Sequence, residues 1–381
     1  MSDVNQRALD THKELKGKLS VESKGEVESM QDLSVFYSPG VGAVSAHLAE
    51  AEDETRDYTG TNNSVAIISD GSAVLGLGNI GPRAALPVME GKAMLFKRFA
   101  GIDGYPVVLD AHEVDEIVAA VKAVAPSYGA INLEDIAAPQ CFAIEERLKA
   151  ELDIPIMHDD QHGTAVVTLA GLINSMKVVG RELDGCRIVI VGAGAAGTAI
   201  AKLLALYAPN IELLMVDSKG IISSDRTDLN SEKQALLEFT NKQNTSGDLA
   251  SAVEGAQVFI GVSQPGLLTA EMVATMADDP IVFALANPVP EIMPDVAKEA
   301  GVAVIATGRS DFPNQVNNAV AFPGIFRGAL DNRVSAITDQ HKIAAAEAIA
   351  ALIETPTADE VIPNVFDERL VPAIAKLIIE E

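Results

Sequence analysis

The sequence predicts an α/β fold: an N-terminal α/β substrate- and metal-binding domain, then a doubly wound parallel sheet of the Rossmann type, then C-terminal helices. Three observations support this class. Short apolar runs of strand length alternate with segments of helical periodicity, as in sheets whose strands are joined by helices. A glycine-rich motif at 192–197 follows one such run directly. Acidic pairs at 134–135 and 159–160 follow two others.

The N-terminal half supplies the first group of elements. Residues 5–57 are mostly polar and helical in pattern. After them we expect strands at 65–69, 106–109, 131–133 and 155–157, with helices at 114–125 and 141–152. These elements define a first domain over residues 1–158. In open parallel sheets functional side chains collect at the carboxyl ends of strands, so both acidic pairs are expected at that edge.

The remaining residues, 159–381, are expected to form the dinucleotide-binding domain with its C-terminal helices. A helix at 163–179 leads into it, and residues 224–250 read as mixed loop and helix. We expect strands at 187–191, 211–216, 257–262, 281–286 and 302–306, and later helices at 198–204, 343–353 and 371–379.

The glycine motif points to a bound dinucleotide. Gly192 permits a tight turn after the strand, Gly194 lets the backbone approach a pyrophosphate, and Gly197 lets helix and strand pack closely. The free N–H groups of the following helix attract phosphates. Asp217 ends the next strand 20 residues past Gly197, where a ribose-binding carboxylate is expected. The alternative is a glycine-rich turn that binds no ligand. The strand, the glycine motif, the following helix and the acid at the end of the next strand all favour a dinucleotide site instead.

The choice between NAD and NADP stays open at this point. Asp217 accepting hydrogen bonds from ribose hydroxyls favours NAD. Lys219 and Arg226 lie just beyond it and could neutralise a 2′-phosphate. We therefore expect NAD, or NADP, as cofactor.

Composition excludes several classes of protein. A net charge of -26 argues against nucleic acid and anionic membranes as partners. The two cysteines, Cys141 and Cys186, give no disulfide framework, which fits a reducing cytoplasm. The first residues have no apolar core of a signal peptide, and no apolar stretch reaches the length of a membrane span.

The acidic pairs suit a hard divalent cation. Mg²⁺ and Mn²⁺ prefer oxygen ligands and need few of them from the protein. Zinc is not expected, because no Cys/His cluster has ligand spacing. The alternative is that these acids cap helices or pair with bases; Asp159 or Asp160 could be the N-cap of a helix that begins near Gly163.

Seven further motifs make the chain resemble malic enzymes, in order and over nearly its whole length. The resemblance is to the small bacterial and archaeal form. The motifs are Tyr37-Ser38-Pro39-Gly40-Val41, Gly76-Leu77-Gly78, Glu90-Gly91-Lys92, Asn132-Leu133-Glu134-Asp135, His158-Asp159-Asp160-Gln161-His162-Gly163-Thr164, Ala286-Asn287-Pro288 and Gln315-Val316-Asn317-Asn318.

The resemblance implies two catalytic residues and two binding residues. Lys92 matches the lysine that transfers a proton at the substrate hydroxyl, and Tyr37 matches the tyrosine that protonates the enol product. Asn287 and Asn318 match asparagines that bind the substrate carboxylate and the nicotinamide end of the cofactor. A lysine serves as base only if its pKa falls from about 10 towards neutrality.

The resemblance also implies the metal ligands. Glu134, Asp135 and Asp160 match them, and Asp159 matches a neighbouring acid that supports them.

The chain departs from the family pattern at the arginine that binds malate. Larger family members have an arginine before the Leu-Gly-Leu-Gly stretch, whereas this chain has Ser72-Ala73 at the Glu-Arg positions. Another cation must replace that arginine. Arg83, Lys97 and Arg309 are the candidates, and the sequence does not choose among them.

The predicted function is oxidative decarboxylation of malate to pyruvate and CO₂, with reduction of NAD(P) and with Mg²⁺ or Mn²⁺. We expect a homodimer or a higher homo-oligomer. Three alternatives stay open: a relative that decarboxylates oxaloacetate or converts malate to lactate, a metal-independent amino-acid dehydrogenase, and a catalytically silent dinucleotide-binding regulator.

Overall fold

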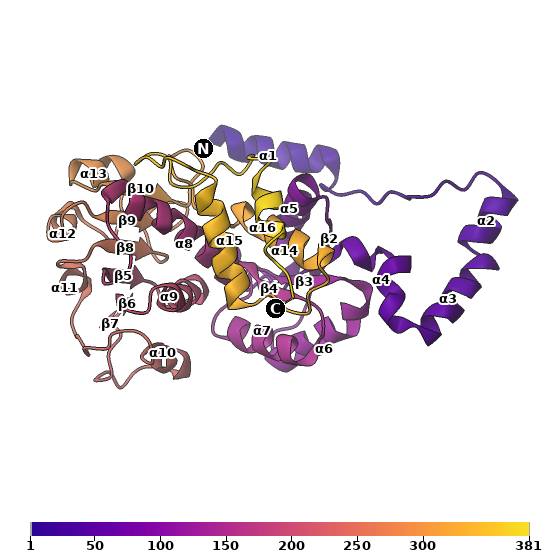
Figure 1. The fold of residues 1–381 in the computed structure, drawn as a ribbon, viewed down its shortest axis with the longest axis horizontal. Coiled ribbons are helices and arrows are strands. Elements are labelled where there is room, and N and C mark those ends of the chain that lie inside the picture. The colour runs from indigo at the N-terminus through magenta and orange to yellow at the C-terminus, as the bar shows by residue number, and fades with distance from the viewer. Residues whose placement is uncertain (1, 381) are drawn as a thin grey trace.

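The computed structural model describes residues 2–380 and has two parallel sheets flanked by helices (Figure 1). The first sheet has the strand order β2-β1-β3-β4. Its strands are β1 (Ser64–Ser69), β2 (Asp103–Val108), β3 (Ala130–Leu133) and β4 (Ile156–His158). Its helices are α5 (Pro82–Ala100), α6 (Val114–Val124) and α7 (Gln140–Glu151). All three strand pairings are parallel, as predicted.

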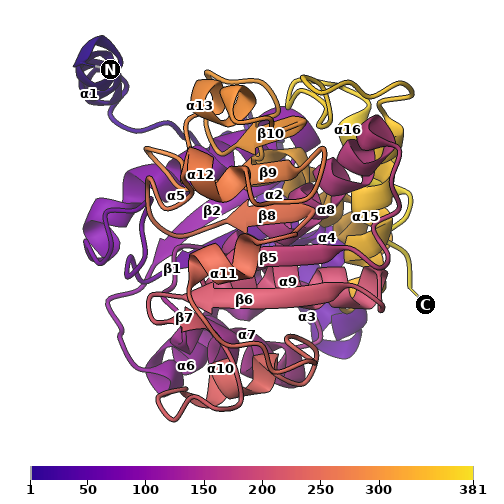
Figure 2. The ribbon, with the colours of Figure 1, turned by 90° about the vertical axis from the view of Figure 1, so that its left-hand side faces the viewer.

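The second sheet has the order β10-β9-β8-β5-β6-β7, and Figure 2 shows its strands side by side. Its strands are β5 (Arg187–Val191), β6 (Glu212–Asp217), β7 (Gly220–Ile221), β8 (Val258–Gly261), β9 (Ile281–Ala284) and β10 (Val304–Thr307). Its helices are α8 (Asp159–Val179), α9 (Ala195–Tyr207), α10 (Ser231–Leu236), α11 (Leu249–Val253), α12 (Ala270–Val273) and α13 (Pro294–Glu299). Only β7 pairs antiparallel, so the predicted doubly wound sheet is confirmed.

The apolar runs locate the strands because the sheets are covered on both faces. Every residue of β1, β3, β8, β9 and β10 is buried. Strands buried on both faces have continuous apolar runs instead of an alternating pattern. β2 differs because it lies at the edge of its sheet and is only partly buried. It begins at Asp103, before the predicted start at 106.

Three C-terminal helices follow the second sheet. They are α14 (Phe322–Asp331), α15 (Asp339–Ala351) and α16 (Leu370–Ala375). α15 packs on α8, whereas α14 packs back on α5 of the first sheet, where the Phe96 ring lies 4.7 Å from the Phe322 ring and 5.3 Å from the Phe326 ring, centroid to centroid. The domain boundary predicted between residues 158 and 159 falls where β4 meets α8, and it stays a prediction.

The helix α14 is absent from the sequence-based expectations, for a physical reason. It contains a proline in its first turn and two glycines, which are poor helix formers. A Cβ on Gly324 would lie 2.7 Å from the Cβ of Ile374, and a Cβ on Gly328 would collide with the backbone of Ala375. The glycines therefore permit close packing of α14 against α16.

The N-terminal segment extends away from the sheets. It contains α1 (Ser2–Leu15), α2 (Met30–Phe36), α3 (Gly40–Glu50) and α4 (Thr55–Tyr58). No residue of α2 or α3 is buried, and Figure 1 places this pair at the far right, apart from both sheets. We call residues 30–50 the α2–α3 hairpin. No helix within residues 2–380 is long and apolar enough to cross a bilayer.

Candidate functional site

Four acidic residues meet at the carboxyl ends of β3 and β4. Glu134 and Asp135 follow β3, and α8 begins at Asp159 directly after β4, so Asp159 and Asp160 occupy the first turn of a helix. The helix starts before the predicted residue 163, and neither aspartate is its N-cap, which is His158. The two pairs touch, because the Asp135 amide donates to Asp160 Oδ2 at 2.7 Å.

Lys92 reaches this acid cluster from the middle of α5. Its side chain is buried, and its Nζ lies 2.8 Å from Glu134 Oε1 and in contact with Asp159 Oδ2. The same Nζ lies 4.1 Å from the centroid of the Phe322 ring at the start of α14. A lysine is rarely buried without a partner, and the two carboxylates supply one here. Lys92 is therefore a buried, paired lysine and not a solvent-exposed one.

The single positive charge of Lys92 does not balance the negative charges of the acids around it. Burial alone lowers the pKa of Lys92, but Asp159, Glu134 and Asp160 together raise the pKa above the ordinary lysine value. Burial, with Asp160 and Glu134 nearby, raises the pKa of Asp135 to about 8. Burial also raises the pKa of Asp159 to about 6, although Lys92 opposes this. The cluster thus carries more negative charge than the protein compensates.

The chemistry of the cluster fits a hard divalent cation. Asp135 Oδ2 and Asp159 Oδ1 are buried and have no hydrogen-bond partner among the described residues. Such oxygens are the ligands that Mg²⁺ and Mn²⁺ prefer. Within residues 2–380, however, no three His, Cys, Asp or Glu side chains are already arranged as an ion cage. Glu134 instead faces Lys92 and accepts from Asn132 Nδ2 at 2.9 Å. Metal binding therefore stays a prediction.

The predicted binding asparagines lie at the same edge. A Cβ on Gly76, in the loop after β1, would be 3.3 Å from the backbone oxygen of Asn287 after β9. A Cβ on Gly163 would be 3.0 Å from Asn318 Cβ and would collide with Asp159. The structure therefore brings Asn287 to the loop after β1 and Asn318 to the acid cluster.

Tyr37 is not part of this assembly within one chain. It follows α2 in the α2–α3 hairpin, and 68% of its surface is exposed. Only its backbone forms hydrogen bonds with the described residues. The hairpin lies apart from α5, which carries Lys92 (Figure 1).

The three candidate cations for the substrate carboxylate lie in different places relative to the acid cluster. Lys97 pairs at 2.7 Å with Asp103, the first residue of β2, so it lies at the opposite edge of the sheet. Arg309 pairs with Asp311 and donates to the Pro288 oxygen at 3.1 Å. Arg83 is exposed in the first turn of α5 and has no ion pair among the described residues. The geometry removes Lys97 from the set.

The glycine motif has the backbone expected of a phosphate-binding turn. Gly192 has φ of 113°, and a Cβ there would lie 2.7 Å from the Val262 oxygen. A Cβ on Gly197 would collide with Gly192, whereas one on Gly194 would meet no atom within 4 Å. α9 begins at Ala195 without a side-chain cap, so its first N–H groups are open to an anion.

Asp217 ends β6 as predicted, but cations already surround it. Arg226 donates to both carboxylate oxygens, at 2.8 and 3.0 Å, and Lys233 donates to Oδ2 at 2.5 Å. The Lys219 backbone N–H adds a bond of 2.9 Å to Oδ1. Although burial alone raises its pKa, these bonds lower the pKa of Asp217 to about 2. Lys233 was missed by the sequence reasoning, while the Lys219 side chain pairs with Asp228 instead.

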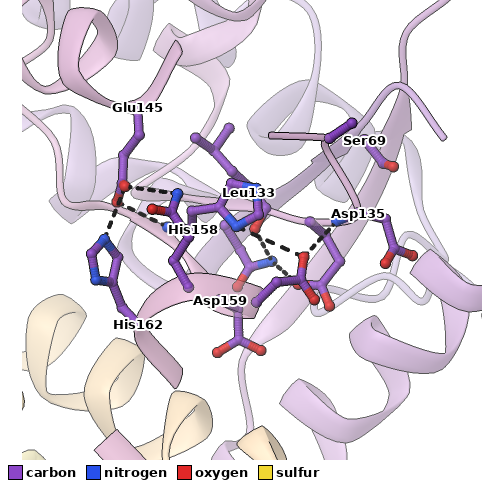
Figure 3. Close-up of polar contacts among 12 residues, drawn as sticks. Ser69, Leu133, Asp135, Glu145, His158, Asp159 and His162 are labelled. Carbon is purple, nitrogen blue, oxygen red and sulfur yellow. Dashed lines mark hydrogen bonds and ion pairs between the residues drawn. The ribbon is translucent and has the colours of Figure 1, made fainter. Parts of the chain in front are cut away.

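Glu145 is a second residue that the sequence reasoning missed. It is buried on α7 and accepts from the His158 amide at 3.1 Å, from Gln161 at 3.3 Å and from the His162 ring at 2.9 Å (Figure 3). It therefore holds the first turn of α8, which carries Asp159 and Asp160. Its helical spacing from the apolar Cys141 was the available signal.

Two family models match the chain. The model described as "Malic enzyme, N-terminal domain" matches residues 16–114 and 111–149. The model described as "Malic enzyme, NAD binding domain" matches residues 161–378.

Curated relatives match over nearly the whole chain. A bifunctional malic/malolactic enzyme of Bacillus subtilis is 54% identical, covering 98% of this chain and 92% of its own length. An NAD-dependent malic enzyme of Geobacillus stearothermophilus is 51% identical, covering 99% and 79%. An NADP-dependent malic enzyme of Halomonas elongata is 48% identical, covering 99% and 93%.

Solved structures agree with this. The NAD-dependent malic enzyme of Thermotoga maritima superposes with a TM-score of 0.95 at 46% identity, covering 97% of this chain and 98% of its own. The malic enzyme of Pyrococcus horikoshii has a TM-score of 0.94 at 45% identity, covering 98% and 89%.

Proposed function

The chain belongs to the malic enzyme family, and from this premise we propose which of its residues perform the reaction. The protein is an oxidoreductase that converts malate to pyruvate and CO₂ while reducing NAD or NADP. The observation that carries the site assignment is the contact of buried Lys92 with Glu134 and Asp159 at the edge where Asn318 also lies. A metal-independent amino-acid dehydrogenase and a silent regulator do not fit this family and this site.

We assign the divalent cation to Glu134, Asp135 and Asp160. Their oxygens have the hardness that Mg²⁺ or Mn²⁺ requires. When bound, such an ion would supply positive charge to polarise the C2 oxygen of the substrate, and a bound nicotinamide would supply the hydride acceptor. The protein's own contribution is to hold these acids at adjacent strand ends, with Glu145 fixing the first turn of α8.

Lys92 is the group that moves the proton of the C2 hydroxyl. Among the described residues, two side chains with a basic nitrogen form ion pairs with the acid cluster: Lys92 through its Nζ and His158 through its ring. The pKa of Lys92 is raised by the carboxylates around it. A cation held by those carboxylates would weaken their effect on the pKa of Lys92, and the neutral amine would then be accessible.

Tyr37 is assigned to the proton transfer at C3 and is supplied by a second copy of the chain. The α2–α3 hairpin exposes Leu33, Val35, Phe36 and Val41, each between 39% and 62% of its surface. Contiguous exposed apolar surface of this kind marks a protein interface. A homodimer in which each hairpin covers the partner buries these side chains and gives Tyr37 access to a cluster that it does not contact in its own chain.

Mixed dimers test this assignment. Lys92→Ala and Tyr37→Phe chains are purified separately, shown to be nearly inactive, then mixed and allowed to exchange subunits. If Lys92 and Tyr37 come from different chains, half of the dimers are mixed and one of their two sites is intact. About a quarter of wild-type activity then returns, given twofold symmetry. No recovery after demonstrated exchange would place both residues in one chain.

The cofactor assignment includes NADP. The sequence favours NAD because Asp217 can accept hydrogen bonds from the ribose hydroxyls. A carboxylate has about four acceptor positions, and Arg226, Lys233 and the Lys219 amide already occupy them. The charge of Asp217 is therefore compensated, and we propose that both cofactors are used.

The overall assignment is tested by following NAD(P)H absorbance with malate, with each cofactor in turn, with and without Mn²⁺. Because one relative is named a bifunctional malic/malolactic enzyme, the products are also separated. Pyruvate with one equivalent of NAD(P)H supports oxidative decarboxylation, whereas lactate without net reduction identifies a malolactic reaction.

A further inference from the structure

A polar pocket lies at the edge of the first sheet that is opposite the acid cluster. It has a volume of about 370 Å³, and four cations line it, Lys24, Arg56, Arg327 and Arg333, against one acid, Asp331. The chain as a whole carries a net charge of -26. The excess of cations in this pocket therefore contrasts with the negative net charge of the whole chain.

Residues directly before two strands of the first sheet position two cations of this pocket. Asn63, another lining residue, directly precedes β1, and Gly129 directly precedes β3. Arg56 Nη2 donates to the Gly129 oxygen at 2.8 Å, and Arg327 Nη1 donates to Asn63 Oδ1 at 2.7 Å. Both acceptors are neutral, so the guanidinium groups are positioned without loss of their charge.

The acids nearby neutralise only part of the positive charge. Arg327 pairs with Asp331 at 2.6 Å, and Arg333 pairs with Asp57. Lys24 and Arg56 have no ion pair among the described residues. Asp103, which Lys24 influences electrostatically, is already bound by Lys97 at 2.7 Å.

Two further observations show that the cations are under-compensated. Arg327 Nε is buried and has no acceptor among the described residues. The pKa of Arg56 is lowered by burial and then by the positive charge of Arg333. Like charges held together in this way attract an anion with more than one negative charge.

We propose that this pocket binds a small dianion, a dicarboxylate or a phosphate group, at a site separate from the active site. Guanidinium groups recognise both chemistries through paired N–H donors. Lys24 and Arg56 supply the unpaired charge, and Arg327 and Arg333 supply further N–H donors.

The experiment uses the full-length protein in EDTA, without cofactor. Inorganic phosphate and succinate are titrated calorimetrically in separate arms, at constant ionic strength set with chloride. The arm that gives saturable binding identifies the ligand chemistry. The variants are Lys24→Gln and Arg56→Gln for the pocket, Arg83→Gln for the active-site edge, and Lys202→Gln as an exposed cation elsewhere.

Saturable binding that weakens at least tenfold in Lys24→Gln and Arg56→Gln, and persists in Arg83→Gln and Lys202→Gln, supports the proposal. Lys24→Gln alters a side chain without an ion pair, so loss of folding does not confuse the result. Absence of saturable binding by either anion overturns the proposal. So does binding that is equal in all variants or that is lost only in Arg83→Gln. Malate oxidation, measured separately, decides the catalytic assignment independently.

Discussion

Asp135 and Asp217 are both aspartates at the carboxyl end of a parallel strand, yet their surroundings differ. Asp135 has an orphaned buried oxygen and other acids beside it, and its pKa is raised to about 8. Asp217 has its acceptor positions filled by Arg226, Lys233 and a backbone N–H, and its pKa is lowered to about 2. An acid that the protein leaves uncompensated is available to a bound cation, whereas one that the protein saturates is not.

The strongest test of this comparison removes the charge of Asp135, the aspartate that the protein leaves uncompensated. Asp135→Asn should reduce turnover with Mn²⁺ to background, a loss of about 10³-fold or more, because a charged ligand is lost from a site that must polarise the substrate. In EDTA the same variant should be more stable than wild type, with a Tm several degrees higher, because buried repulsion with Asp160 and Glu134 is relieved.

The matched control for Asp135→Asn is Asp217→Asn. It should lower the Tm in EDTA, because Arg226 and Lys233 lose the carboxylate that they share. If both variants shift stability in the same direction, the two acids are not compensated differently. Full activity of Asp135→Asn after exhaustive chelation would contradict the metal assignment.

Lys92 gives the next largest effect. Lys92→Ala should lower kcat by about 10²–10⁴-fold, the usual contribution of a positioned proton-transfer group. Cofactor binding, followed by NADH fluorescence, should change little. Small added amines should restore part of the activity because they replace the missing base.

Tyr37→Phe provides the comparison for Lys92. It should also lower kcat, but amines should not restore it, because a phenol and not an amine is missing. A near-normal kcat in Lys92→Ala would leave Lys92 as a packing residue against Phe322 and leave the base unidentified.

These contrasts also show how far sequence reasoning reached. The position of the acids at adjacent strand ends followed from apolar runs and parallel pairing, which are local signals. Their charge balance did not, because it depends on contacts between distant segments. Lys92 meets Asp159 across 67 positions. Lys233 reaches Asp217 across 16, and the nearer Lys219 turns to Asp228 instead.

Helix boundaries failed for a related reason. The first turn of α8 carries Asp159, Asp160 and Gly163, so its apolar periodicity begins late, and the hydrogen bonds from Glu145 that fix this turn come from another helix. α14 was missed because Gly324 and Gly328 lower its helix propensity and gain their value only when α16 packs against them. Tyr37 is a third kind of case, since its assigned role involves a second copy of the chain.

A substitution next to Asp217, whose acceptor positions are filled, should have a smaller effect that depends on the cofactor. Arg226→Gln should lower kcat/KM with NADP by about tenfold or more, the value of a lost hydrogen bond to a charged group. Catalysis with NAD should change much less, because no 2′-phosphate is present. Lys298→Gln, an exposed cation paired with Asp359, is the control. Equal losses with NAD and NADP would mean that Arg226 only braces Asp217.

The smallest effect is the pH dependence of stability, where the two acids have opposite signs. The folded-state pKa of Asp135 lies above its unfolded value, so its contribution is fully present below about pH 4 and is lost as the pH rises through about 8. The folded-state pKa of Asp217 lies below its unfolded value, so its contribution is present above about pH 4 and is lost as the pH falls through about 2. In EDTA the urea midpoint should therefore decline between pH 5 and 8. Mn²⁺ or Asp135→Asn should flatten that decline, while Asp217→Asn should leave it in place and alter only the acid limb. A decline of the same size in Asp135→Asn would show that another buried group causes it.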